Sequence, residues 1–518
     1  MNRSRRTIRS SELLAAAVWI VPLLIIGAIY FSPRHLVTPD KAVAFLIALG
    51  IVVLAARAPG RSLIVLVCLL PFQGLLLAWL FRLGAPELFV RYAAAWKETL
   101  ALGVILAGAR SFIASGRRAD ALDRLGLGFV ALAVLYALLQ EKLIPGAPTA
   151  SSIRLLGFRE TAGFVLVLLG ARHAPLGRDF ARRAGLAILT VGVAVSAVGV
   201  FEFLAPSTWN HFVVQTVGYP HYQQVVLNSY VANPGSILSY SYLGGTQLVR
   251  IGSVFLDPLS LSWYLILPFA VALERAVRRQ GSPLNMAAML LIGSALLLTQ
   301  TRSAIFGAVV AAALLYQPAA GRRRHWRTQL GVLLVGLAVV AVPAVVGTGG
   351  AKRIQQLGSK ANPDTAGHLS GFYQGLDRME SLPFGLGLGT AAGTGQRFHV
   401  AGDVIAENNY LEVGDELGIA GAVLFVALTI ALIRWLRRAG RTDPDPLIAA
   451  TWTAAVGLAV SAWFLQTWSV FAVAWTFWGV AGAALCITRQ HAAARSAGRA
   501  PSDPQPSRVQ RPALIASR

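Results

Sequence analysis

Between two strongly apolar stretches lies a polar segment, PDTAGHLSGFYQGLDRMESLPFGLGLGTAAGTGQRFHVAGDVIAENNYLEVGDELGIAG, residues 363–421. It is rich in glycine, aspartate, glutamate and histidine. It contains no apolar run that reaches the roughly 20 residues a helix needs to cross a bilayer. Because long loops are uncommon unless they have a function, we expect this segment to be the working part of the protein.

The composition of the whole chain indicates a membrane protein. Of the 518 residues, 55% are hydrophobic and only 13% are charged, whereas a soluble domain carries about 25% charged residues. We therefore predict an all-α polytopic membrane protein with about 12–14 transmembrane helices and two large external loops. The apolar stretches behind this prediction are residues 12–31, 41–56, 62–81, 94–110, 125–140, 155–170, 184–204, 259–274, 284–299, 303–317, 328–347, 417–433, 447–464 and 467–487.

The formal net charge of +23 is interpreted as a topology signal and not as a sign of nucleic-acid binding. When the arginine-rich N-terminus is placed in the cytoplasm and the stretches alternate, the whole positive excess falls on cytoplasmic segments, as the positive-inside rule requires. Both termini are then cytoplasmic. The first apolar stretch lacks a signal-peptide cleavage site, so we predict that it is a retained helix. Cys68 and Cys486 lie inside apolar stretches and predict neither a disulfide nor a metal site.

The stretches and loops divide the chain into six regions. We expect an N-terminal bundle of about seven helices at 1–204, an aromatic external loop at 205–258, central transmembrane helices at 259–349, a large external catalytic loop at 350–416, C-terminal transmembrane helices at 417–487 and a disordered cytoplasmic tail at 488–518. Within the catalytic loop, the apolar spacing of residues 368–380 predicts a short helix.

Two groups of charged residues are predicted near the external face of the N-terminal bundle. The groups are Arg91 with Lys97 and Glu98, and Arg154 with Arg159 and Glu160. Charges this close to a bilayer often line a cavity or a pathway. Alternatively, the long side chains extend to the interface and anchor their helices. Both interpretations stay open, with Arg154 and Arg159 kept as candidates for substrate binding.

The external loop at 205–258 carries no charged residue between Glu202 and Arg250. It is instead rich in aromatic and amide side chains. Aromatic rings beside neutral hydrogen-bonding groups suit sugar rings, whose C–H faces stack while their hydroxyls need partners. An aromatic belt at the membrane interface would have the same composition, so the sequence leaves these two roles open.

Two arginines are predicted at the external membrane boundary. Arg250 precedes Asp257 at the entry of one apolar stretch, and Arg302 lies in the short link TQTRSAIFG between two others. An arginine at an external hairpin goes against the charge asymmetry unless it has an anionic partner, and guanidinium groups bind phosphate bidentately. We therefore expect Arg302 to bind an anionic ligand.

The glycine run at 384–389, FGLGLG, is predicted to form a tight turn. A nucleotide-binding loop would need a preceding strand and a following helix in a βαβ unit, and here the run lies between membrane helices. We expect a turn in which the backbone approaches a ligand or a helix.

Four pieces of the chain resemble, in order, motifs of the O-antigen ligase/Wzy polymerase superfamily. They are RIGSVFLDP at 250–258, LTQTRSAIFG at 298–307, LPFGLGLGT at 382–390 and ENNYLEVGDELGIAG at 407–421. The last piece departs from the family pattern at its first position, because Glu407 stands where many ligases have histidine. The resemblance covers roughly residues 250–435 and suggests a GT-C-like membrane architecture.

The resemblance implies transfer of a glycan from a polyprenyl-diphosphate carrier to an acceptor hydroxyl, at the outer, periplasmic or external face of the cytoplasmic membrane. It implies no metal, nucleotide or other cofactor. The expected partners are the lipid-linked oligosaccharide, membrane lipids, a flippase and chain-length regulator proteins, with no nucleic acid. The expected product is surface polysaccharide of the cell envelope, made by a membrane glycosyltransferase.

The resemblance also assigns roles to residues. Arg302 and Arg250 would bind the diphosphate and stabilise it as it leaves, while Glu407 would take the proton of the acceptor hydroxyl as a general base. Such a displacement inverts the anomeric centre. A helix-start carboxylate favoured by the helix dipole is the alternative role for Glu407. The further candidates for substrate binding are Arg154, Arg159, Asp257, His368, Arg378, Asn408, Tyr410 and Glu416, and Glu412 is a further residue that could orient the acceptor.

Three classes of function remain to be distinguished: glycan transfer by a polymerase or a ligase, transport, and a non-catalytic role. A polymerase and a ligase share the same chemistry and differ in the acceptor, and Glu407 in place of the ligase-type histidine favours a polymerase. A lipid-linked sugar flippase or another transporter would concentrate polar groups at mid-membrane depth and often shows internal repeats, which this sequence does not. A non-catalytic membrane scaffold is the third alternative.

Overall fold

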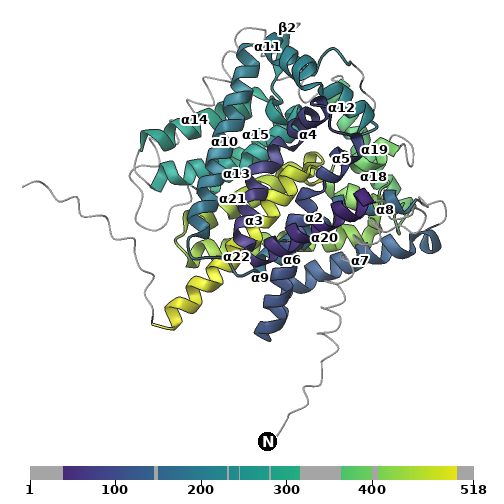
Figure 1. Cartoon of the computed structure of the whole chain (residues 1–518). Helices are drawn as coiled ribbons and strands as arrows, with labels where there is room; N and C mark the ends of the chain where they lie inside the picture. The colour runs from purple at the N-terminus through teal and green to yellow at the C-terminus, as the bar shows by residue number, and fades with distance from the viewer. Residues whose placement is uncertain are drawn as a thin grey trace, which may run out of the picture.

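The computed structural model describes residues 39–144, 150–229, 231, 233–243, 246–278, 282–315, 363–398 and 406–498. Within these ranges the chain is almost entirely helical, and its helices pack side by side into one bundle (Figure 1). Eight of the described helical segments are long and apolar enough to cross a membrane. The prediction of an all-α polytopic membrane protein is confirmed.

The predicted apolar stretches correspond closely to helices. The eight long segments are Pro59–Arg82 (α3, Pro59–Leu69; η1, Leu70–Phe72; α4, Gln73–Arg82), Glu87–Ser115 (α5, Glu87–Ala93; α6, Trp96–Ser115), Ala121–Lys142 (in α7, Ala121–Leu143), Phe180–Leu204 (α10), Pro258–Val277 (in α13, Pro258–Arg278), Asn409–Thr442 (α20), Pro446–Phe464 (α21) and Phe471–Ser496 (α22). The shorter apolar helices are Val43–Arg57 (in α2, Pro39–Arg57), Gly163–His173 (α9), Pro283–Leu298 (α14) and Arg302–Leu315 (α15). The predicted stretches 12–31 and 328–347 lie outside the described residues.

Three predicted boundaries differ from the structure. The stretch 155–170 is two helices, because α8 (Ser151–Thr161) ends just before α9 begins. Helix α20 begins at Asn409, well before the predicted residue 417. Helix α22 continues to Ser496, so the prediction of a disordered tail is wrong for its first residues. Hydrogen bonds explain the longer helix, since Gln490 Nε2 donates to Leu176 O at 3.3 Å and the Arg489 guanidinium donates to Arg172 O.

Glycines let the central helices approach closely. A Cβ placed on Gly108 of α6 would lie 2.2 Å from Gly170 O of α9, and one on Gly482 of α22 would lie 2.3 Å from Leu168 O of α9. Helix α9 is therefore in backbone contact with helices on two sides. Small residues commonly permit such contacts between membrane helices, and here they fix the middle of the bundle.

The external loop at 205–258 is folded. It contains α11 (Pro206–His211), a π-helix η2 (Phe212–Val217), α12 (Tyr219–Val225) and a two-stranded antiparallel sheet of β1 (Ser239–Leu243) and β2 (Thr246–Arg250). The register pairs Tyr240 with Val249 and Ser239 with Arg250. The sheet is an exception to the all-α prediction, and it follows from serine, tyrosine, threonine and valine in two short runs, a composition that favours strands. After a short 3₁₀ turn, η3 (Ser253–Phe255), the chain enters α13.

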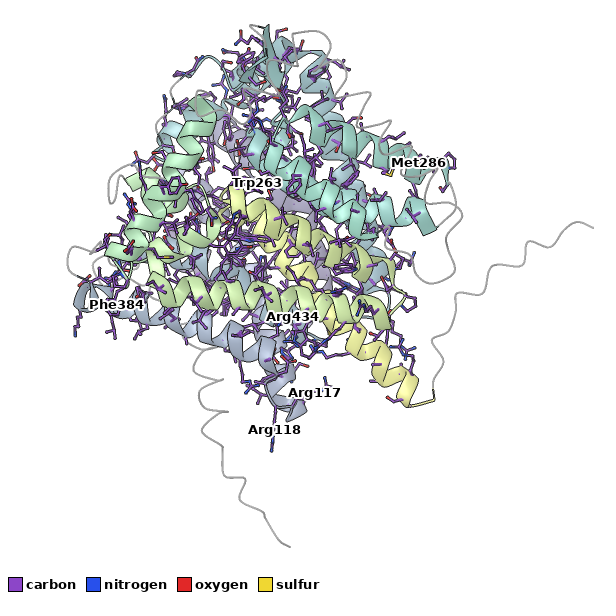
Figure 2. All side chains as sticks on the ribbon, turned by 180° about the vertical axis from the view of Figure 1, so that it is seen from behind. Arg117, Arg118, Trp263, Met286, Phe384 and Arg434 are labelled. Atoms are coloured by element: carbon purple, nitrogen blue, oxygen red, sulfur yellow. The ribbon has the colours of Figure 1, made fainter. Side chains whose placement is uncertain are left out.

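Two places in the bundle, well apart from each other, carry interacting charged residues. Figure 2 labels Arg117 and Arg118 at one end and Phe384 at the outer edge far from them. We call the first the arginine end; there the buried guanidinium of Arg172 binds Asp123 at 2.6 Å. We call the second the loop end; it comprises α8, the loop at 205–258, the helices α18 (Pro363–Ser381) and α19 (Ala392–Phe398), and the start of α20. The alternation of the predicted stretches across the membrane stays a prediction.

Candidate functional site

Helix α20 is broken near its start. Gly418 has φ 69° and ψ −173° inside the helix, a conformation that is essentially restricted to glycine. The segment before the break, Asn409–Leu417, starts at Asn408, whose side-chain oxygen accepts the N–H groups of Tyr410 and Leu411 at 2.8 and 3.1 Å. The candidate motif at 407–421 is therefore a short capped helix, a break and the start of a long membrane helix.

The glycine run supplies the hydrogen bonds that this break would otherwise leave unmade. Leu386 N–H donates to Asp415 O at 2.6 Å, and Gly387 N–H donates to Glu416 O at 3.1 Å. Across the break, Ile419 N–H donates to Pro383 O at 3.0 Å. Inside a membrane protein such freed backbone groups need protein partners, and the loop before α19 provides them.

Glycine is required in the run for two reasons. Gly385, Gly387 and Gly389 have φ of 72°, 97° and 81°, which other residues rarely adopt. In addition, a Cβ on Gly385 would lie 2.6 Å from Gly418 N. Of the two partners that we expected for this turn, a ligand or a helix, the structure shows a helix.

Beneath the glycine run lies a group of buried carboxylates. Glu412, Asp415 and Glu416 are three and four residues apart, so they share one face of the capped segment. Glu416 accepts Gly389 N–H at 2.9 Å with one oxygen, and with the other it accepts the hydroxyl of Thr161 on α8. Glu412 accepts the hydroxyl of Ser469 at 2.7 Å. We call Glu160, Glu412, Asp415 and Glu416 the carboxylate group.

Glu160 joins this group from α8. Its carboxylate accepts Thr394 N–H at 3.2 Å, and it lies within electrostatic reach of Glu412 and Glu416. Buried oxygens of Glu412 and Asp415 have no hydrogen-bond partner among the described residues. Asp415 is the member that the sequence analysis missed, although its spacing from Glu412 was a usable signal.

The two candidate arginines of α8 are ion-paired. Arg154 lies 2.7 Å from Glu141 of α7, and Arg159 lies 3.2 Å from Glu98 of α6. The guanidinium of Arg159 also stacks over the ring of Phe471, 4.4 Å from its centroid. The ion pairs anchor α8 to its neighbours, and they also keep two charged groups at the loop end. Both interpretations of this group, helix anchoring and substrate binding, therefore stay open.

A second basic residue meets Arg159 from α19. Arg397 lies within electrostatic reach of Arg91, Arg159 and Glu160, and burial followed by the charges of these two arginines lowers its pKa. Beside it, burial raises the pKa of Tyr222 to about 12, against the opposing effect of Arg397. Arginines from three helices, α5, α8 and α19, thus converge at the loop end. We call Arg91, Arg159 and Arg397 the three-helix arginines; the sequence analysis missed Arg397.

Arg250 and Arg302 are brought together at one link. Arg250, the last residue of β2, donates from Nε to Thr299 O at 3.0 Å and from Nη2 to the Thr301 hydroxyl at 3.3 Å. Arg302 follows directly as the first residue of α15, and its side chain is exposed. Within the described part of the chain, no carboxylate pairs with Arg302. Arg250 and Arg302, which were both predicted at the external membrane boundary, therefore lie close together in the structure.

Asp257 starts the helix that follows Arg250. Its carboxylate accepts the N–H groups of Leu259 and Ser260 at 3.3 and 2.8 Å, together with the Ser260 hydroxyl at 2.5 Å. These are the bonds of a helix N-cap. Asp257 therefore positions α13 beside the Arg250–Arg302 link.

A buried glutamate holds the turn between Arg250 and Asp257. Glu202, at the end of α10, accepts Gly252 N–H at 2.9 Å and Ser253 N–H at 2.6 Å with the same oxygen. Ser253 has a positive φ of 50°, and its hydroxyl donates to Val195 O at 2.7 Å. The sequence analysis noted Glu202 only as the last charge before the aromatic loop. Its role in holding this turn depends on residues about 50 positions away in the sequence, so only the structure shows it.

Glu407 lies at the same end of α21 as Arg302. The next residue, Asn408, donates from Nδ2 to Trp463 O at 2.8 Å. Phe306 of α15, one helical turn after Arg302, packs against Phe464 at the same end of α21, with the ring centroids 6.3 Å apart. The side chain of Glu407 is partly exposed, with its Oε2 atom buried. Glu407, Arg250 and Arg302 therefore gather around the ends of α15 and α21.

The remaining candidates lie on either side of this gathering. The Tyr410 hydroxyl donates to Ala459 O at 3.1 Å, so it packs against α21 as Asn408 does. Arg378 of α18 is partly buried and lies within electrostatic reach of Asp415. His368 is also on α18, but its side chain is outside the described part of the structure. Among the described residues, no group of three or more histidines, cysteines, aspartates or glutamates could hold a metal ion.

Fold and site together define a polytopic α-helical membrane protein with its polar candidate residues gathered at one end. The O-antigen ligase family model matches residues 287–426. The match runs from α14 to α20 and includes Arg302, the glycine run and Glu407; Arg250 lies outside it. The predicted resemblance is confirmed, and this part of the chain carries an O-antigen ligase domain. The domain indicates glycan transfer of the ligase or polymerase type. No curated protein matches the chain.

Proposed function

We propose that the protein transfers a glycan from a polyprenyl-diphosphate carrier to an acceptor hydroxyl at the outer face of the cytoplasmic membrane, and that it polymerises the repeat units of a surface polysaccharide. The observation that carries the proposal is the gathering of Arg250, Arg302 and Glu407 around the ends of α15 and α21. Two guanidinium groups and a carboxylate around the ends of the same two helices suit a reaction in which a diphosphate leaves while a hydroxyl loses its proton.

In the proposed step, the acceptor oxygen forms a bond to the anomeric carbon while the bond from that carbon to the diphosphate oxygen breaks. Glu407 takes the hydroxyl proton. The negative charge that develops on the diphosphate is stabilised by Arg302 and Arg250, which remain charged at all relevant pH values. Arg250 is held in place by Thr299 and Thr301. The displacement inverts the anomeric centre and uses neither a metal nor a nucleotide.

A polymerase acts on two lipid-linked substrates, so it needs two places for anionic head groups. The Arg250–Arg302 link offers the first. The three-helix arginines offer the second, because guanidinium groups from separate helices suit bidentate phosphate recognition. Arg397 and Arg159 form the centre of this second place, and Glu160 of the carboxylate group lies 3.9 Å from Arg159. This arrangement favours the polymerase, whereas a ligase would use the second place for a different acceptor lipid or a protein.

A transporter is the second candidate, and the break in α20 is the observation that favours it. Interrupted helices line the binding sites of many transporters. In this chain, however, the break at Gly418 is filled by backbone from the glycine run. The freed groups are thus used inside the protein.

Deleting the gene in the host and sizing the lipid-linked glycans distinguishes these functions. We expect short, single-unit intermediates on the outer face of the membrane. Long polymer that stays on its carrier would indicate a ligase instead. Intermediates trapped on the cytoplasmic face would indicate transport, and the catalytic roles given to Arg250, Arg302 and Glu407 would then be wrong.

The role of Glu407 is tested in the purified protein with lipid-linked repeat units. We expect both Glu407→Ala and Glu407→Gln to lower the transfer rate by roughly 10²–10⁴-fold, because neither variant has a base at this position. The control is Asp179→Asn, which changes an exposed carboxylate just before α10 that takes no part in the proposed site. Full activity in Glu407→Gln with loss in Glu407→Ala would mean that Glu407 acts by its shape and hydrogen bonds.

A further inference from the structure

The turn Leu382–Phe384, between α18 and the glycine run, exposes large apolar side chains. Phe384 is 71% exposed, and Leu382 is exposed beside it. Contiguous apolar residues at a protein surface commonly mark a contact with a partner or a membrane. The placement of this turn decides which of the two applies.

The turn is fixed between two membrane helices. The hydroxyl of Tyr136 on α7 donates to Phe384 O at 2.8 Å, and Pro383 O accepts the N–H of Ile419 on α20. The turn therefore cannot be read as a mobile loop tip. Its position is set by the spans themselves, close to where the long part of α20 begins.

Both of these helices expose apolar residues next to the turn. Leu135, Leu138 and Leu139 are exposed on α7, and Ile419 and Val423 are exposed on α20, Val423 with 61%. Because α7 and α20 contain candidate membrane spans, such residues face lipid in the bilayer. The apolar surface of the two spans continues onto Leu382 and Phe384. Figure 2 shows Phe384 at the outer edge of the molecule, beside the end of α7.

Helix α18, which leads into the turn, has two different flanks. Phe372 and Leu376 are four residues apart and so lie on one flank, and Leu376 is exposed. The opposite flank is polar, since Gln374 donates to the Ser370 hydroxyl at 2.9 Å and Asp377 is exposed. Helices that lie in the plane of a membrane interface have this division.

We propose that the turn Leu382–Phe384 and the apolar flank of α18 insert into the lipid bilayer at the loop end of the bundle. The occupant of this surface is lipid, not a second protein, because the surface is continuous with the lipid-facing sides of α7 and α20. The large polar segment is then partly a membrane-dipping element. Its contact with lipid is tied by hydrogen bonds to the break in α20.

Spin labels measure this insertion directly. The chain has two cysteines, Cys68 and Cys486, which are replaced by alanine before a single cysteine is introduced at Phe384. The labelled protein is reconstituted into vesicles of phosphatidylcholine and phosphatidylglycerol. Accessibility to oxygen, which concentrates in the bilayer, is compared with accessibility to a water-soluble nickel complex. Val423→Cys serves as the lipid-facing reference, and Gln374→Cys serves as the aqueous one.

We expect the oxygen-to-nickel accessibility ratio at Phe384→Cys to be several-fold higher than at Gln374→Cys and to approach that at Val423→Cys. If Phe384→Cys does not fold, Leu382→Cys makes the same test with a side chain whose removal exposes less apolar surface. A ratio equal to that of Gln374→Cys would overturn the proposal. The measurement needs no enzymatic activity, so its outcome is independent of the proposed glycan transfer.

Discussion

Two turns at the loop end are held in the same way but serve different neighbours. Glu202 accepts two N–H groups of the turn at Gly252 and Ser253, and Glu416 accepts the N–H of Gly389 and, at 3.4 Å, that of Ala391. The first turn carries Arg250 to the link at Arg302. The second turn carries no charged side chain, and its backbone fills the break in α20. A buried carboxylate thus holds the turn that carries Arg250, a proposed site residue, in one place, and the turn that supports a helix in the other.

This difference predicts that damage to the first turn affects transfer and that damage to the second affects folding. We expect Arg250→Ala to leave the fold largely intact, because Arg250 is partly exposed and its partners Thr299 and Thr301 remain in the chain. We expect it to lower the transfer rate by roughly 10²–10³-fold, the usual effect of removing one group that stabilises a developing anion. Rates with purified lipid-linked repeat units measure this effect.

Arg302→Ala should show a loss of the same order, since we propose that both guanidinium groups bind one diphosphate. The matched control is Arg441→Ala, an exposed arginine in the last turn of α20, which should transfer normally. If Arg250→Ala lowered stability while its folded fraction kept full transfer activity, the first turn would serve folding and not transfer.

For the second turn, Gly418→Ala should act on stability. Any side chain at φ 69° and ψ −173° costs about 1–3 kcal/mol of backbone strain, and its Cβ would lie 2.3 Å from Pro383 O. Because that oxygen belongs to the backbone that fills the break, relief requires the glycine run to move. Thermal unfolding in detergent measures the loss of stability.

Gly116→Ala is the control that separates strain from crowding. Gly116 also has a positive φ, 61°, but a Cβ there would meet nothing within 4 Å. This variant should cost about 1–2 kcal/mol, the conformational penalty alone. If the two variants lose equal stability, the contact between the glycine run and α20 contributes nothing, and the second turn is not a support.

The sequence predicted the positions of most helices, because these depend on hydropathy and apolar spacing. Apolar runs of helical length marked the spans, and the spacing at 368–380 marked α18. The start of α20 was missed because Glu412, Asp415 and Glu416 resemble a solvated loop, and their burial depends on α8 and the glycine run, which are distant in sequence. The β-hairpin was missed because its two short runs lie inside a loop without clear alternation.

The residues of the candidate site also fall into those that the sequence could indicate and those that it could not. Arg250, Arg302 and Glu407 were selected from motifs, and the fold brings them to one place, although their roles stay predictions. Glu202 could not be selected, because nothing in a lone glutamate at the end of an apolar stretch reveals which backbone it binds. Side chains that touch substrates leave motif signals, whereas those that hold turns depend on tertiary contacts.

The smallest predicted effect compares the two holding glutamates themselves. In Glu202→Gln and Glu416→Gln, the amide oxygen can still accept the N–H groups of its turn. What changes is the charge. At Glu202 its loss weakens two charge-assisted hydrogen bonds. At Glu416 it also relieves repulsion from Glu160 and Glu412, which lie within electrostatic reach.

We therefore expect Glu416→Gln to be more stable than Glu202→Gln by about 1 kcal/mol, measured as the difference between their unfolding midpoints. The matched alanine variants are the controls. Each leaves two N–H groups of its turn without an acceptor, so both should lose roughly 2–6 kcal/mol. Equal midpoints for the two glutamine variants would mean that the carboxylate group carries no net repulsion, because its members share protons. The two turns would then differ in what they carry and not in how they are held.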